Sequence, residues 1–118
     1  MTSTCVFDGT GADQPFVLWD YSPSLQRVLI RSHNNEQNLD LIFSGVERMW
    51  FDKTHLISPK IIHDDAKALY LVQSEKEEVA GIKAAFFHCY RNRLDRMHSS
   101  IEGTEMEYGE RVDGEFIK

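Results

Sequence analysis

The sequence predicts a mainly β, single-domain protein, an antiparallel β-sandwich or a partly open barrel, with an α+β fold as the alternative. Four short apolar stretches follow one another at Phe16–Tyr21, Arg27–Arg31, Asn38–Phe43 and Val46–Phe51. Turn-forming residues separate them, as in an antiparallel meander. No linker rich in Pro, Gly or Ser divides the chain, so we expect residues 1–118 to form one domain.

Alternating side chains support strands in these stretches. Val28 and Ile30 would point to one face of a strand and Arg31 to the other, which predicts one face in water. Leu29 shares the face of Arg31. We expect three or four of these strands to form one sheet within a fold of six to eight strands.

The segments around the meander are less regular. Residues 1–15 predict an irregular lead-in with a brief strand at Cys5–Phe7. Residues 52–59 break the strand pattern, and a short apolar pair then precedes His63–Asp65, which predicts a turn or a helix cap. For residues 66–72 the composition favours a strand over a short helix.

Residues 74–98 predict either a hairpin or a helix. Ser74 and Glu77 have capping-box spacing, and apolar residues recur at nearly helical intervals. Gly81 opposes a helix, because glycine in a helix interior costs about 1 kcal/mol relative to alanine. We favour the hairpin, with a charged tip at Glu75–Glu78. The acidic segment 102–118 is expected to fray, with one edge strand near Met106 and Tyr108.

Several strand cores and turns together resemble a family of small uncharacterised bacterial proteins. The shared pieces are Leu29–Ser32, Asn38–Val46, Leu71–Glu75 with Val79–Gly81, and Ser99–Ile101. The resemblance implies a β-rich fold and a strand after Ser74, but no activity, cofactor or catalytic residue.

Charge and composition restrict the classes of partner. The formal net charge is −6, of which residues 102–118 carry −4, so a nucleic-acid partner is disfavoured. The two cysteines form no metal-binding pair and fit a reducing cytoplasm. No run reaches the ~18 apolar residues of a membrane span. We therefore expect a soluble cytoplasmic protein without a membrane association.

A reaction centre is only weakly indicated. His63, Asp64 and Asp65 offer nitrogen and oxygen ligands, and His88 could join them in an enzyme or ligand-binding site at a sheet mouth. A solvated turn explains the first three residues equally well. His88 and Cys89 cannot form a dyad, since adjacent strand residues point to opposite faces. No motif for a cofactor or metal is present, so none is expected.

Aromatic and arginine residues suggest a contact surface instead. Protein interfaces concentrate these residue types at their centres, and the candidates here are Trp19, Tyr21, Arg31, Arg48 and Trp50. The competing interpretation places most of these rings in the core. We expect a protein-binding module, for example an immunity-type inhibitor or adaptor, with enzymatic or small-ligand binding as the alternative. Self-association as a homodimer through a sheet edge is a further hypothesis.

Overall fold

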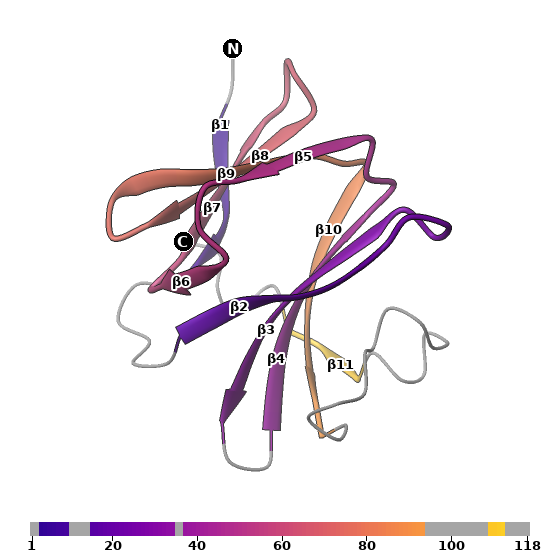
Figure 1. Ribbon diagram of the computed structural model, residues 1–118, viewed down its shortest axis with the longest axis vertical. Coiled ribbons are helices and arrows are strands. Elements are labelled where there is room, and N and C mark those ends of the chain that lie inside the picture. Colours follow the sequence, from indigo (N-terminus) through magenta and orange to yellow (C-terminus); the bar gives the residue numbers. More distant parts are fainter. Residues whose placement is uncertain (1–2, 10–14, 35–36, 94–108, 113–118) are drawn as a thin grey trace.

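A computed structural model of the chain describes residues 3–9, 15–34, 37–93 and 109–112 and arranges them in two β-sheets (Figure 1). The strands within these residues are β1 (Ser3–Asp8), β2 (Pro15–Ser22), β3 (Arg27–Asn34), β4 (Gln37–Ser44), β5 (Arg48–Phe51), β6 (His55–Ile57), β7 (Lys60–Asp64), β8 (Leu69–Ser74), β9 (Glu77–Lys83), β10 (Phe86–Asn92) and β11 (Glu110–Arg111).

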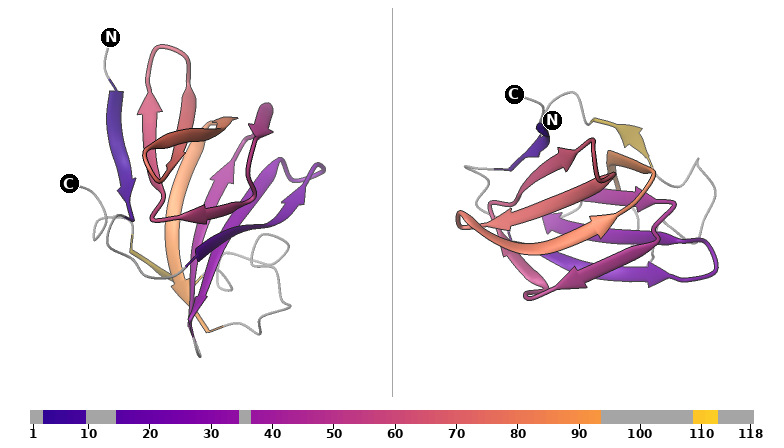
Figure 2. Two further views of the ribbon diagram at one scale, coloured as in Figure 1. Left: turned by 60° about the vertical axis from the view of Figure 1, so that its left-hand side comes forward. Right: turned by 90° about the horizontal axis from the view of Figure 1, so that it is seen from above.

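The two sheets are open and antiparallel throughout. Sheet A has the strand order β1-β7-β8-β9-β5, and sheet B has the order β11-β10-β4-β3-β2-β6. They pack against each other without closing into a barrel (Figure 2). The prediction of a mainly β sandwich is therefore confirmed. The helix considered for residues 74–98 is wrong for the described part of that segment, because residues 77–83 and 86–92 are strands.

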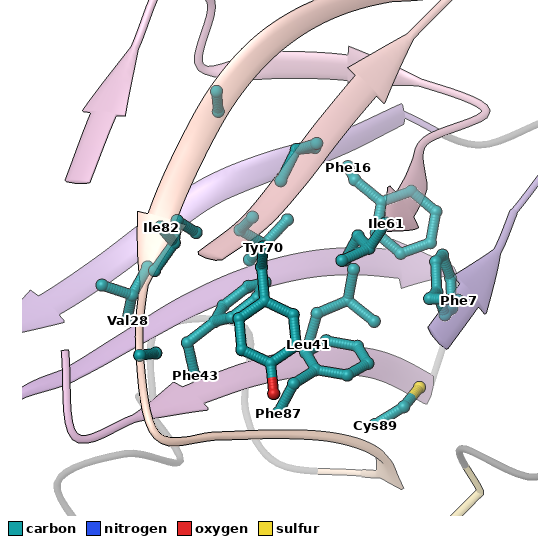
Figure 3. Packing of buried hydrophobic residues seen from close by; sticks show 14 of the residues in the cluster. Phe7, Phe16, Val28, Leu41, Phe43, Ile61, Tyr70, Ile82, Phe87 and Cys89 are labelled. Atoms are coloured by element: carbon teal, nitrogen blue, oxygen red, sulfur yellow. The ribbon is translucent and has the colours of Figure 1, made fainter. Parts of the chain in front are cut away.

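Aromatic rings from both sheets fill the space between them (Figure 3). Phe43 of sheet B contacts Tyr70 of sheet A edge-to-face, with ring centroids 5.5 Å apart, and Phe87 of sheet B lies 4.9 Å from Phe43. Phe7 of sheet A contacts Phe16 of sheet B at 5.8 Å. Such pairs stabilise a core by about 0.5–1.5 kcal/mol beyond the area that they bury. These rings hold the two layers together.

The predicted meander is only partly one sheet. β2, β3 and β4 are consecutive neighbours in sheet B, but β5 belongs to sheet A, so the expectation that it could be a fourth strand of the same sheet is wrong. The chain crosses between sheets at Gly45, which has a φ of 70° and therefore a conformation that favours glycine. The crossing from β9 to β10 is tied to the one at Gly45 by a 3.0 Å hydrogen bond from Ala85 N to the Ser44 carbonyl.

The charged hairpin tip lies where the sequence places it. β8 and β9 pair through a two-residue loop, Glu75–Lys76, with Ser74 opposite Glu77. Both loop residues have positive φ angles, 52° and 72°, as a type I′ turn requires. This turn gives a twist that matches that of the flanking strands.

Three strands were not predicted at their full extent. β1 covers more of the lead-in than the brief strand expected at Cys5–Phe7, β6 lies in the segment 52–59, and β7 replaces the turn or cap expected at His63–Asp65. The turn comes later, at residues 65–68. Each of these strands is short. Its position is determined by hydrogen-bonded pairing with a strand that is distant in the sequence, such as β1 with β7 and β6 with β2. The described residues therefore contain eleven strands, whereas six to eight were expected.

The outer face of sheet B is not the wet face that alternation in β3 predicted. Leu29 is buried in a second apolar cluster with Ile42, against which Trp19 and Tyr90 pack. Arg31, on the same face, is 1% exposed. Both faces of β3 are therefore covered in this region.

The acidic segment 102–118 lies largely outside the described residues, and so does the edge strand expected near Met106 and Tyr108. Within it, β11 pairs with β10, Arg111 lying opposite Tyr90. The described portions of the chain contain no helix with the length and apolar character needed to span a membrane.

Candidate binding surfaces

The five residues proposed as one contact surface lie on two different sheets. Trp19, Tyr21 and Arg31 belong to β2 and β3 of sheet B, whereas Arg48 and Trp50 belong to β5 of sheet A. The structure therefore does not bring them together. The residues on sheet B and those on sheet A therefore have different surroundings, which are described separately below.

Arg31 serves the packing of sheet B. Its guanidinium holds the Asp40 carboxylate with two hydrogen bonds, Nε to Oδ1 at 2.6 Å and Nη2 to Oδ2 at 2.9 Å. Asn92 donates to the second carboxylate oxygen at 2.7 Å, and Asn38 donates to Asn92 at 2.8 Å. All four side chains are buried. A buried charge needs such partners, so Arg31 does not contribute to an exposed contact surface.

Trp19 is partly held by the same network. Its ring lies 5.5 Å from the guanidinium carbon of Arg31, which is a cation–π distance, and it packs on Leu29 and Ile42. Tyr21 extends outward and is 41% exposed. Of the aromatic residues proposed on sheet B, Tyr21 is thus the one that presents its ring to solvent.

Trp50 is exposed for a reason that the strand register makes clear. It lies directly opposite Gly81 of β9, and its indole lies on the glycine, where a Cβ atom would clash with Nε1. The ring rests on bare backbone and remains 43% exposed. The exposed part of the indole is a large apolar surface beside the glycine.

A hollow of about 430 Å³ opens beside this indole on the outer face of sheet A. Its lining comes from β5, β9, the start of β8 and the turn before β8: Arg48, Met49, Trp50, Lys67, Leu69, Gly81 and Lys83. We call this region, without the inward-facing Met49, the Trp50 surface. Its floor is apolar, and its border is basic.

The border contains three cations. Lys83 lies 3.4 Å from the Glu47 carboxylate. Within the described parts of the chain, neither Arg48 nor Lys67 forms an ion pair. Three cations therefore border the indole of a protein whose net charge is −6.

The apolar floor continues across sheet A. Successive register pairs connect Trp50 to Gly81, Gly81 to Leu71, and Leu71 to Ile62. Residues paired in register share a face of the sheet. Leu71 and Ile62 are half-buried, so a continuous apolar row leads from the Trp50 surface toward β1.

The alternative site around His63 is a local turn arrangement. His63 Nδ1 lies 2.8 Å from the Asp65 carboxylate, and the Asp64 carboxylate accepts a 3.0 Å hydrogen bond from the Ala66 backbone. The His63 ring stacks on Tyr70 at a centroid distance of 4.3 Å. These contacts close the turn after β7 and orient the imidazole toward the core side of sheet A.

His88 does not join this group. It lines a pocket on the outer face of sheet B together with Ile42, so sheet B lies between its ring and that of His63. Across the described stretches, no group of three or more His, Cys, Asp or Glu side chains is arranged to hold a metal ion. The structure therefore does not assemble the four residues of the alternative site.

Sequence reasoning did not single out Lys67, Leu69, Gly81 or Lys83 as parts of a surface. Gly81 was noted only as a residue that opposes a helix. The one available signal was a glycine within an apolar strand, which often marks the close approach of another group. Which group approaches depends on the register between β5 and β9.

We also compared the chain with known proteins. No family model, curated protein or solved structure matches it. The resemblance to small bacterial proteins remains a prediction.

Proposed function

We propose that this chain is a protein-binding module of the inhibitor or adaptor type, and that it contacts its partner through the Trp50 surface. The observation that carries the proposal is the position of Trp50, which lies against Gly81 at the edge of an apolar hollow with a basic border. Tryptophan and arginine are enriched among the residues that contribute most to binding energy at interfaces.

The surface has the arrangement of an interface centre. An apolar floor of Trp50 and Leu69 is surrounded by Arg48, Lys67 and Lys83, which resembles an apolar core within a polar rim. The Trp50 surface is therefore suited to a partner that inserts an apolar side chain beside the indole.

The border predicts the chemistry of the partner. Three cations favour a contact region that carries carboxylates, because complementary charges accelerate association and select between partners. We propose that the partner presents acidic residues around an apolar one, even though the chain as a whole is acidic.

Affinity capture of binding proteins from the native host, with this chain as bait, tests the proposal. The wild-type chain and Trp50→Ala would serve as baits beside Tyr21→Ala, which removes an equally exposed ring from the other sheet. We expect one protein to bind wild type and Tyr21→Ala and to be lost with Trp50→Ala. Recovery should fall with rising salt, since screening weakens contacts between exposed charges.

A photoreactive amino acid at position 69 makes the test direct. It should cross-link the same protein in living cells, whereas the same group at position 21 should not. Equal capture by Trp50→Ala, or cross-linking from position 21 only, would contradict the proposal.

A further inference from the structure

A second pocket, of about 410 Å³, lies on the outer face of sheet B, and nothing in the proposed function uses it. Its lining residues are Arg27, Ile42, Ser44, Phe86, His88, Tyr90 and Arg111. The Trp50 surface lies on the outer face of the other sheet. The two regions are therefore separate, and either could bind without the other.

Strand register brings this lining together from segments far apart in the sequence. Phe86 lies opposite Ser44, and Ser44 lies opposite Arg27, so these three side chains form one row across β10, β4 and β3. The next row on the same face contains His88 opposite Ile42. Tyr90 and Arg111 form the third row, across β10 and β11. With strands about 4.8 Å apart, the rows make a compact patch.

The described residues that line this pocket include cationic side chains, whereas the chain as a whole is acidic. Among the described residues that line it, two carry guanidinium groups and none carries a carboxylate. Arg27, His88, Tyr90 and Arg111 also have interactions of their own. A guanidinium has five N–H donors and can contact more than one acceptor at the same time. The hydroxyls of Ser44 and Tyr90 and the imidazole of His88 add further hydrogen-bonding groups.

An apolar ring stands at the border of this polar pocket. Phe86 is 61% exposed, although burial of a phenylalanine is favourable and its neighbour Phe87 is buried in the core. His88 and Tyr90 make an edge-to-face contact at 6.2 Å on the same face. A flat apolar group could therefore stack beside the arginines that hold an anion.

We propose that this pocket binds a small organic anion, in which a carboxylate or phosphate group is attached to a flat apolar body. Arg27 and Arg111 would hold the oxygen atoms with charge-assisted hydrogen bonds, and Phe86 would cover the apolar body. The volume lies within the range of roughly 300–1,000 Å³ that is usual for ligand pockets.

Titration of the isotope-labelled chain, followed by NMR, tests the proposal. The probes are phenyl phosphate and benzoate, with inorganic phosphate, neutral phenol and cationic benzylamine for comparison. We expect low-millimolar phenyl phosphate or benzoate to shift the amide signals of β4 and β10. Whichever anion binds more tightly identifies the head group. Phenol and benzylamine should bind at least about tenfold more weakly, as expected when a hydrogen bond to a charged group is lost.

Substitutions assign the contacts. Arg27→Gln and Arg111→Gln should each weaken binding of the aromatic anion by about tenfold or more. Lys53→Gln, at an exposed cation that lines neither this pocket nor the Trp50 surface, should leave it unchanged. Phe86→Ser should weaken phenyl phosphate but not inorganic phosphate. Dispersed spectra would verify that each variant is folded.

Two results would overturn the site. One is the absence of shifts with both aromatic anions, and the other is affinity that does not depend on the charge of the probe or on Arg27 and Arg111. Neither result bears on the Trp50 surface, because that test measures a protein partner on the other sheet.

Discussion

Arg31 and Asp40 are register partners on β3 and β4, and their side chains form a fully buried, two-point ion pair on the outer face of sheet B. Asn92 and Asn38 extend the pair into a polar network within an apolar surrounding. An ion pair in such a place stabilises a fold only while both partners are present, since each charge has lost its hydration.

Removing one charge from this pair should therefore be costly. We expect Asp40→Ala to lower the free energy of unfolding by about 3–5 kcal/mol, because Arg31 would remain buried and charged. The double variant Arg31→Met with Asp40→Leu should lose less than the two single changes combined. Urea denaturation measures both effects. Lys53→Met is the control, since the exposed pair Lys53–Glu77 at 3.8 Å should contribute at most about 1 kcal/mol. Strict additivity of the two buried changes would contradict this account.

Adding a methyl group under the indole should displace Trp50. In Gly81→Ala the new Cβ would clash with the indole ring, so we expect the ring to move and its fluorescence to change in a Trp19→Phe background. Partner capture should fall together with that change. In a Trp50→Ala background the same substitution should be neutral or stabilising, because alanine loses less backbone entropy than glycine on folding. Unchanged fluorescence in Gly81→Ala would show that the ring does not rest on the glycine.

Ser74 connects the two sheets, and its loss should destabilise both. Its hydroxyl accepts a 2.9 Å hydrogen bond from the Ile57 backbone of β6 and donates to the Ile57 carbonyl at 3.3 Å. We expect Ser74→Ala to cost about 1–3 kcal/mol, the usual penalty for leaving a buried group without its partner. Ser22→Ala is the comparison, since its contacts are longer, at 3.4 Å. Equal costs in the two variants, measured by denaturation, would be against this role.

The hairpin tip contains strain that can be removed. Glu75 and Lys76 both occupy positive φ, although type I′ turns strongly prefer Asn-Gly. Replacing the pair with Asn-Gly should raise the free energy of unfolding by about 0.5–2 kcal/mol. Thermal and urea unfolding would measure the gain. The reversed order, Gly-Asn, should also stabilise the fold, and a loss of stability in both variants would show that these side chains have another role.

Ionisation of Tyr70 should weaken the fold at alkaline pH. Burial raises the pKa of the Tyr70 phenol above its ordinary value of 10.0, and the charge of Asp65 raises it further. The unfolded chain therefore releases this proton at a lower pH than the folded chain. The stabilisation is complete below pH 10 and is lost as the pH rises from there through the folded pKa. Tyr70→Phe should show a smaller decrease in stability over that range, with Tyr21→Phe behaving as wild type. Parallel curves for the two variants would exclude Tyr70 as the cause.

Local residue patterns were sufficient for much of the fold. The alternation in β2, β3 and β4 and a hairpin with a charged tip at Glu75–Glu78 depend on neighbouring residues, and both were predicted. The loop itself is shorter than that tip, because β9 already begins at Glu77. β6 and β7 were not, because short strands of this kind are stabilised by pairing with distant segments. β6 pairs with β2, and β7 pairs with β1 and β8.

The sequence by itself determined that this is a β protein, because the period of apolar side chains depends only on their spacing along the chain. Only the tertiary structure decided which side chains reach a partner. Arg31 and Arg48 occupy similar positions in short apolar strands, yet Arg31 lies opposite Asp40 and is buried, whereas Arg48 lies opposite Lys83 and is exposed. Alternation distinguishes two faces of a strand, but the register with other strands determines which face is covered. That register placed Trp50 on Gly81.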